Sequence, residues 1–106
     1  MTQASGGKVA VLARVPAQPG RRDELVEKLQ AAIDNANTEA GTLIYILHTN
    51  DKDPDAVFFY ELYTDQEAFS AHGSSDRFKE IGATLRDVAG GRPELTILTP
   101  VVGKGL

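Results

Sequence analysis

Residues 56–72, which read AVFFYELYTDQEAFSAH, decide the fold that we expect for this chain. Their first half alternates as a β-strand does. One face of this strand carries Val57, Phe59, Glu61 and Tyr63, and the other carries Phe58, Tyr60 and Leu62. Because both faces are largely apolar, both must be covered. We expect helices to cover the face with Glu61 and a second copy of the protein to cover the face with Leu62. From Thr64 the spacing becomes helical, and Thr64 with Glu67 matches a capping box, which predicts a helix start.

Glu61 is the anomaly in this apolar run, because a carboxylate there loses solvation unless it is paired or borders a polar cavity. Two interpretations are open. Glu61 forms a structural ion pair with His72 or with an arginine such as Arg14 or Arg77, or it stands at the wall of a site between the sheet and the helices.

Length and composition limit the class of protein. The 106 residues fit one domain, and we expect residues 1–7 to be a disordered lead-in and residues 8–106 to be a single domain. A net charge of −4 and a pI near 5.0 argue against nucleic acid and anionic membranes as partners. There is no cysteine, no run of the ~20 apolar residues of a membrane span and no signal-peptide pattern, so the sequence predicts a cytoplasmic protein.

The rest of the chain predicts two further helical regions and three further strands. Strands are expected at 8–15, 42–50 and 92–102, helices at 21–38 and 78–89, and a hairpin turn at 50–55. Residues 73–76 are expected to interrupt the helix that starts near Thr64. Gly41 is expected to accept a positive φ after the first helix. The order is strand, helix, strand, strand, helix, strand, which is typical of a ferredoxin-like α+β fold with a four-stranded antiparallel sheet and helices on one face. We expect the helix-free faces of two subunits to pack together as a dimeric α+β barrel.

The segment FFYELYTDQEAFSAHGSSDRFKEI, preceded by EAGTLIYILH and by a first helix led by Pro19-Gly20, resembles the antibiotic biosynthesis monooxygenase (ABM) family. These are dimeric α+β-barrel proteins that include quinol monooxygenases, and the resemblance covers roughly residues 9–102. Its most specific residues are Glu61, Tyr63, Ala68-Phe69, His72, Ser75 and Phe78. The resemblance implies oxidation of an aromatic phenol or quinol by molecular oxygen, with no metal or flavin.

Some proteins of this kind degrade haem instead, and three positions depart from their pattern. In alignment, their haem-ligating histidine falls on Gly82, their tryptophan on Tyr63 and the asparagine of their first strand near Ala13. Because glycine offers no ligand to iron, we expect no haem. The two histidines show no metal-binding spacing, and no nucleotide-binding glycine motif is present, so we expect no metal and no cofactor.

The resemblance assigns roles around the junction between the third strand and the following helix. His72 would accept or shuttle a proton, Tyr63 would orient the ligand through its hydroxyl, and Glu61 would fix one of them. The walls for a small aromatic ligand would be Phe59, Phe69, Phe78 and Leu85. The plainer alternatives stay open: His72 interacts with a helix C-terminus, and the aromatic residues are ordinary core. Tyr45 and His48 alternate on their strand, so only one of them faces a given cavity.

Two classes of function fit these residues. The first is a homodimeric, cofactor-independent monooxygenase that acts on a phenol or quinol. The second is a binding protein that sequesters an aromatic metabolite in the same pocket without turnover. A third option is a dimeric module whose enzymatic pocket has closed.

Overall fold

The computed structural model describes residues 7–106, so the predicted lead-in at 1–7 lies outside the described residues apart from Gly7. Eight elements follow one another: β1 (Val9–Pro16), α1 (Arg22–Lys28), α2 (Gln30–Ala36), β2 (Thr42–His48), β3 (Ala56–Tyr63), α3 (Gln66–Ser74), α4 (Asp76–Thr84) and β4 (Glu94–Leu98). Within the described part of the chain, no helix has the length and apolar character needed to cross a membrane.

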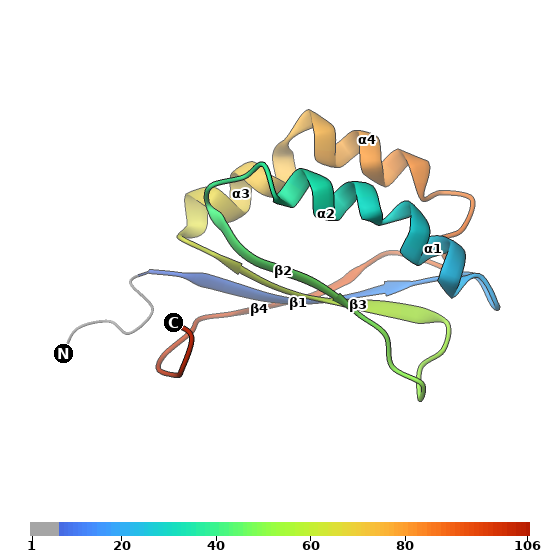
Figure 1. The fold of residues 1–106 in the computed structure, drawn as a ribbon, viewed down its shortest axis with the longest axis horizontal. Coiled ribbons are helices and arrows are strands. Elements are labelled where there is room, and N and C mark those ends of the chain that lie inside the picture. The colour runs from blue at the N-terminus through green and yellow to red at the C-terminus, as the bar shows by residue number, and fades with distance from the viewer. Residues whose placement is uncertain (1–6) are drawn as a thin grey trace.

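The four strands form one antiparallel sheet in the order β2-β3-β1-β4, and the helices cover one of its faces (Figure 1). This confirms the ferredoxin-like α+β fold. The sheet of a single chain is open, with β2 and β4 as its edges. The strands with the most apolar sequences, β1 and β3, are the central pair and run antiparallel from Val9 opposite Tyr63 to Pro16 opposite Ala56.

The helix predicted at 21–38 is interrupted at Leu29, which separates α1 from α2. The amide of Ala32 bonds the carbonyl of Leu29, three residues back, at 3.0 Å, so the turn tightens there. Leu29 stays buried, and so does Leu25 one turn before it. The two helices therefore keep the one apolar stripe that the sequence predicts.

The start of α3 differs by one residue from the capping box. The N-cap is Asp65, not Thr64, and its carboxylate accepts a hydrogen bond from the amide of Ala68 at 2.8 Å. An aspartate at this position satisfies a free amide and also places negative charge at the positive end of the helix dipole.

The helix break falls at Ser75, within the interruption predicted at residues 73–76. Helix α3 continues through Gly73 to Ser74, and the hydroxyl of Ser75 caps α4 by accepting from the amide of Phe78 at 3.1 Å. Helix α4 ends at Thr84. The expected continuation to 89 is a series of turns that bury Val88.

Gly41 does not adopt the positive φ that the sequence predicts; among residues 7–106 only Gly7, Gly20 and Gly105 do. Its role is close packing. A Cβ at Gly41 would lie 2.6 Å from the Cβ of Ala68. The absence of a side chain thus lets α3 approach the start of β2.

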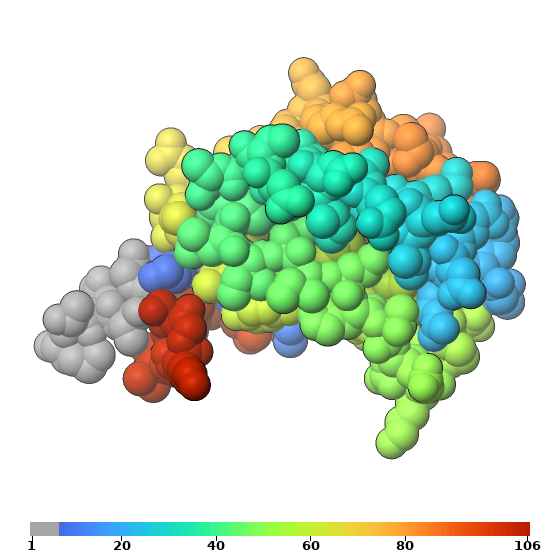
Figure 2. All heavy atoms as spheres, viewed as in Figure 1, coloured from blue at the N-terminus to red at the C-terminus, as the bar shows by residue number. Residues whose placement is uncertain are grey.

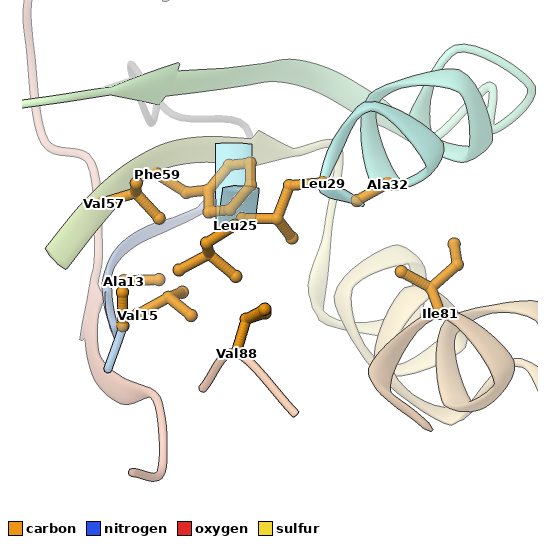
Figure 3. Packing of buried hydrophobic residues seen from close by; sticks show 10 residues of the cluster. Ala13, Val15, Leu25, Leu29, Ala32, Val57, Phe59, Ile81 and Val88 are labelled. Carbon is orange, nitrogen blue, oxygen red and sulfur yellow. The ribbon is translucent and has the colours of Figure 1, made fainter. Parts of the chain in front are cut away.

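The main core lies between the sheet and the helices. Figure 3 shows side chains of β1, β3, α1, α2 and α4 converging with Val88, which follows α4. The buried set comprises Ala13, Val15, Ala17, Leu25, Leu29, Ala32, Val57, Phe59, Ile81 and Val88. A second cluster at the other end of the sheet comprises Val9, Val11 and Tyr63, with Ala68 and Phe69 packed against it. The face of β3 with Phe59, Glu61 and Tyr63 is therefore the helix-covered face.

The other face of the sheet is only partly covered. Leu12 in the central strand β1 is 47% exposed, and Ile46 and Leu98 in the edge strands are similarly open. Leu62, which we expected at the subunit interface, is 2% exposed within the single chain. Near it, residues 100–106 fold back beside Ile44, Tyr60 and Leu62. Figure 2 shows the underside recessed between this segment (red) and the β2–β3 loop (light green).

Candidate functional site

A cavity of about 430 Å³ lies between the sheet and the helices. Six of the seven site residues predicted from the sequence line it: Glu61, His72, Phe59, Phe69, Phe78 and Leu85. They come from β3, α3, α4 and the turn after α4. The remaining wall is mostly aliphatic or aromatic and includes Ala13, Leu29, Tyr45, Ile81, Pro93 and Leu95. An apolar cavity of this size with a few polar groups suits a small organic ligand.

Tyr63, the seventh predicted residue, does not line the cavity. Its side chain is fully buried at the end of β3, and its hydroxyl donates a hydrogen bond to Oε1 of Glu61 at 2.5 Å. Its ring packs against Phe69, with ring centroids 5.3 Å apart. The Tyr63 hydroxyl therefore holds Glu61 in place, and Tyr63 itself does not line the cavity.

His72 is buried in the last turn of α3, with 4% of its surface exposed. Its Nδ1 atom lies 2.7 Å from Oε1 of Glu39, not of Glu61. Three aromatic rings surround the imidazole: Tyr45 at 5.2 Å, Tyr63 at 5.4 Å and Phe78 at 4.8 Å between centroids. Strand β2, strand β3 and helix α4 therefore fix the ring plane, and Glu39 fixes its rotation.

Glu61 makes none of the ion pairs that we considered for it. Arg14 lies on the opposite face of the sheet and bonds Asp53 at 2.8 Å and Glu94 at 3.0 Å. Arg77 is exposed on α4. Burial raises the pKa of the Glu61 carboxyl, and the Tyr63 hydrogen bond and the nearby His72 offset part of that increase. The cavity wall thus contains a carboxyl group that holds its proton more tightly than a solvated glutamate does.

Tyr45 and Glu39 are two residues that the sequence did not single out as site residues. Tyr45 pairs with Glu61 across β2 and β3, so it faces the cavity, and its ring centroid lies 4.7 Å from that of Phe59. Burial raises the pKa of its hydroxyl, and the Glu61 and Glu39 carboxylates add to the shift. His48, the other candidate on β2, is exposed at the hairpin end. The position of Tyr45 could be found from the exact hairpin register, but Glu39 carries no signal because it stands in a connection 33 residues from His72.

The side chains at this site are suited to binding an aromatic ring and accepting a proton. Gly82 also lines the cavity, and it has no side chain that could coordinate a metal. Residues 7–106 contain no group of three or more acidic, histidine or cysteine side chains placed to hold a metal ion.

Comparisons with known proteins agree with this fold and site. The sequence profile described as antibiotic biosynthesis monooxygenase matches residues 8–84. Among curated proteins, none matches the chain. Among solved structures, a protein of Caulobacter crescentus provisionally named an antibiotic biosynthesis monooxygenase is 29% identical, with a TM-score of 0.82 over 91% of this chain and 92% of that chain.

Two further structures are similar. A protein of Chloroflexus aurantiacus with the same provisional name is 27% identical, with a TM-score of 0.77 over 93% of this chain and 98% of that chain. Rv0793 from Mycobacterium tuberculosis is 24% identical and has the same fold, with a TM-score of 0.82 over 93% of this chain and all of that chain. Since the family profile covers well over half of the sequence, the chain belongs to the antibiotic biosynthesis monooxygenase family.

Proposed function

We propose that this protein is a cytoplasmic, cofactor-independent monooxygenase that oxidises an aromatic phenol or quinol with molecular oxygen. The observation that carries the proposal is the pairing of two proton-accepting groups in one apolar cavity. His72 is held by Glu39 at 2.7 Å, and Glu61 is held by Tyr63 at 2.5 Å.

The mechanism begins with binding of the substrate ring among Phe59, Phe69, Phe78 and Leu85, where burial removes water from its hydroxyl group. The imidazole of His72 then takes the hydroxyl proton. The resulting phenolate is electron-rich enough to pass an electron to oxygen, and the two radicals combine at a ring carbon. With a phenol, loss of water leaves a quinone, so one oxygen atom enters the product and the other leaves as water.

The roles differ slightly from those expected from the sequence. His72 is the proton acceptor, and Glu61 borders the substrate while Tyr63 holds the Glu61 carboxylate from behind. Tyr45 also lines the cavity, and we propose that its hydroxyl forms a hydrogen bond with a substrate oxygen. The protein supplies orientation, exclusion of water and a base, which is the part of the reaction that side chains perform.

Oxygen uptake with a panel of phenols and quinols tests the proposal. His72→Ala is expected to lower the rate by about 10²- to 10⁴-fold, the range for loss of a general base. Tyr63→Phe is expected to lower it less, because Glu61 remains in the wall. His48→Gln is the matched control, since this exposed histidine lies outside the cavity. Unchanged oxygen uptake in both the His72 and Tyr63 variants would contradict the site assignment.

A second candidate is a binding protein that sequesters an aromatic metabolite without turnover. The observation in its favour is that Nδ1 of His72 and one oxygen of Glu61 already have internal partners, as polar groups in a binding pocket do. A thermal-shift screen of aromatic compounds, followed by product analysis in air, separates the two. Stabilisation without product supports sequestration, and product supports the enzyme.

A further inference from the structure

We propose that Glu39 is a positioning residue that holds His72 as the Nδ1–H tautomer and so leaves Nε2 as the proton acceptor in the cavity. The tautomer is a property of the folded chain. Its catalytic meaning rests on the proposed function, so the two are tested by separate measurements.

The contacts of Glu39 fix its carboxylate from two sides. Oε1 lies 2.7 Å from Nδ1 of His72, and it accepts a second hydrogen bond from the hydroxyl of Thr42 at 2.9 Å. The backbone is also tied: the amide of Glu39 bonds the carbonyl of Ala36 at 3.0 Å, and the amide of Thr42 bonds the carbonyl of Glu39 at 3.1 Å. The Glu39 side chain is therefore held at the end of the connection between α2 and β2, beside the imidazole.

This arrangement determines which imidazole nitrogen carries the proton. An ionised carboxylate only accepts hydrogen bonds, so Nδ1 must donate. In neutral histidine one ring nitrogen is a donor and the other an acceptor, and hence Nε2 has the lone pair.

The Nε2 atom is available to a ligand. It makes no hydrogen bond within residues 7–106, and it is not among the side-chain atoms there that are fully buried without a partner. The imidazole is otherwise enclosed, but it does line the cavity. The rings of Tyr45 and Phe78 pack against it and oppose a flip that would exchange the two nitrogens.

Without Glu39, the proton would occupy the wrong nitrogen. A free histidine side chain favours the Nε2–H tautomer, which would present a donor to the substrate hydroxyl. The Glu39 carboxylate reverses that preference, and it also stabilises the imidazolium that forms when His72 takes a proton. This second effect needs the negative charge, not only the hydrogen bond.

Nitrogen-15 NMR of the histidine side chains tests the tautomer directly. The chain has two histidines, so His48→Gln leaves His72 as the single source of imidazole signals. At a pH where the ring is neutral, we expect Nδ1 to give a pyrrole-like shift and Nε2 a pyridine-like shift. Adding Glu39→Ala should move the two shifts toward the opposite assignment, and adding Glu39→Gln, which keeps an acceptor oxygen, should move them less. Glu67→Ala, an exposed glutamate in α3, should leave them unchanged.

A pyridine-like shift for Nδ1 in the His48→Gln protein, in which Glu39 is intact, would overturn the proposal. This test holds even if the Glu39 variants fail to fold. Unchanged shifts in a folded Glu39→Ala protein would overturn it as well.

The activity arm uses oxygen uptake with a quinol that the wild-type protein oxidises. Glu39→Ala should lower kcat by about 10- to 100-fold, within the range for weakened general-base catalysis, with little change in KM. If the wild-type protein oxidises no substrate but the NMR shifts are as expected, the positioning role stands and the proposed function fails. An unchanged kcat would overturn the catalytic part of the inference.

Discussion

Glu61 is a buried carboxyl group that receives one hydrogen bond within residues 7–106, from Tyr63, and has no cation as its partner. Burial raises its pKa because the charged form has lost its water. The contrast is Asp53, on the other face of the sheet, where the hydrogen bonds from Arg14 lower the pKa of the carboxyl. A negative charge therefore lowers stability at Glu61 and raises it at Asp53.

The first prediction uses this difference in sign. Below the unfolded-state pKa of about 4.5, Glu61 is protonated in both states; as pH rises through the higher folded-state pKa, ionisation of the buried group costs stability. Glu61→Gln keeps an acceptor for Tyr63 and removes that cost. It should therefore raise the melting temperature at about pH 7 and raise it less at about pH 4.

Asp53→Asn is the matched comparison. The Asp53 pKa is lowered, so its contribution is present above the unfolded value of 3.8 and is lost as pH falls through the folded value. Its neutral variant should be destabilised at about pH 7 and less so at lower pH. Melting curves of the wild-type, Glu61→Gln and Asp53→Asn proteins between about pH 4 and about pH 7 give the check. A Glu61→Gln protein that melts at a lower temperature than the wild type at about pH 7 would contradict the prediction.

At the scale of single residues, the sequence could predict the face on which a residue lies where the apolar pattern is regular. Alternation along β3 placed Phe59, Glu61 and Tyr63 on one face, and the helices cover that face. Alternation does not say how deep each residue lies, and Tyr63 sits behind Glu61 instead of beside the cavity. Glu39 was beyond prediction because the distance to His72 depends on how the α2–β2 connection meets α3 in space.

At the scale of elements, α3 and the start of β2 are held close together by the absence of a side chain. Gly41 lies against Ala68 of α3, and the amide of Thr64 bonds the carbonyl of Gly41 at 2.9 Å. This contact also brings His72 in α3 and Glu39 before β2 within hydrogen-bond distance. Packing at Gly41 therefore supports the site.

The second prediction follows from that contact. Gly41→Ala would place a Cβ 2.6 Å from the Cβ of Ala68, and neither atom belongs to a flexible side-chain end. Overpacking of this kind costs about 1–3 kcal/mol. Gly73→Ala is the control, because a Cβ at Gly73 in α3 would have no atom within 4 Å, and alanine there should stabilise the helix by about 0.5–1 kcal/mol. Urea unfolding of both variants measures the two effects. A Gly41→Ala protein as stable as the wild type would contradict the prediction and show that α3 can move away from Gly41.

Element types were predictable because each has a sufficient run of periodic residues, while their ends depended on local hydrogen bonds. The capping box favoured Thr64, but the carboxylate of Asp65 reaches the amide of Ala68. The sequence predicted a break at residues 73–76, and the hydroxyl of Ser75, which caps α4, fixes the break at Ser75. In each case the sequence offered more than one boundary residue, and a local side-chain hydrogen bond to the helix backbone selected one.

At the scale of the whole molecule, the helix-free face of the sheet is apolar at its centre and recessed between two projecting parts (Figure 2). Leu12 lies on β1 between Tyr60 of β3 and Thr96 of β4, so the exposed leucine is near the middle of this face. Strand β4 is exposed along its whole length. The apolar character of both faces of β3 and the open sheet are the grounds on which we propose that two copies associate through this face.

The last prediction tests that association. Wild-type protein should sediment as a dimer, since an exposed apolar sheet face gains free energy when a second copy removes it from water. Leu12→Asp would place a charge in the middle of the contact and should raise the dissociation constant by at least about 100-fold, because burying an unpaired carboxylate costs several kcal/mol. Ala83→Asp, on the exposed side of α4, is the matched control and should remain dimeric.

Because Leu12 is 47% exposed in the single chain, the Leu12→Asp protein should stay folded by circular dichroism, so loss of the dimer would report on the interface itself. A wild-type protein that sediments as a monomer at all concentrations would contradict the proposal and would leave the open face to another partner.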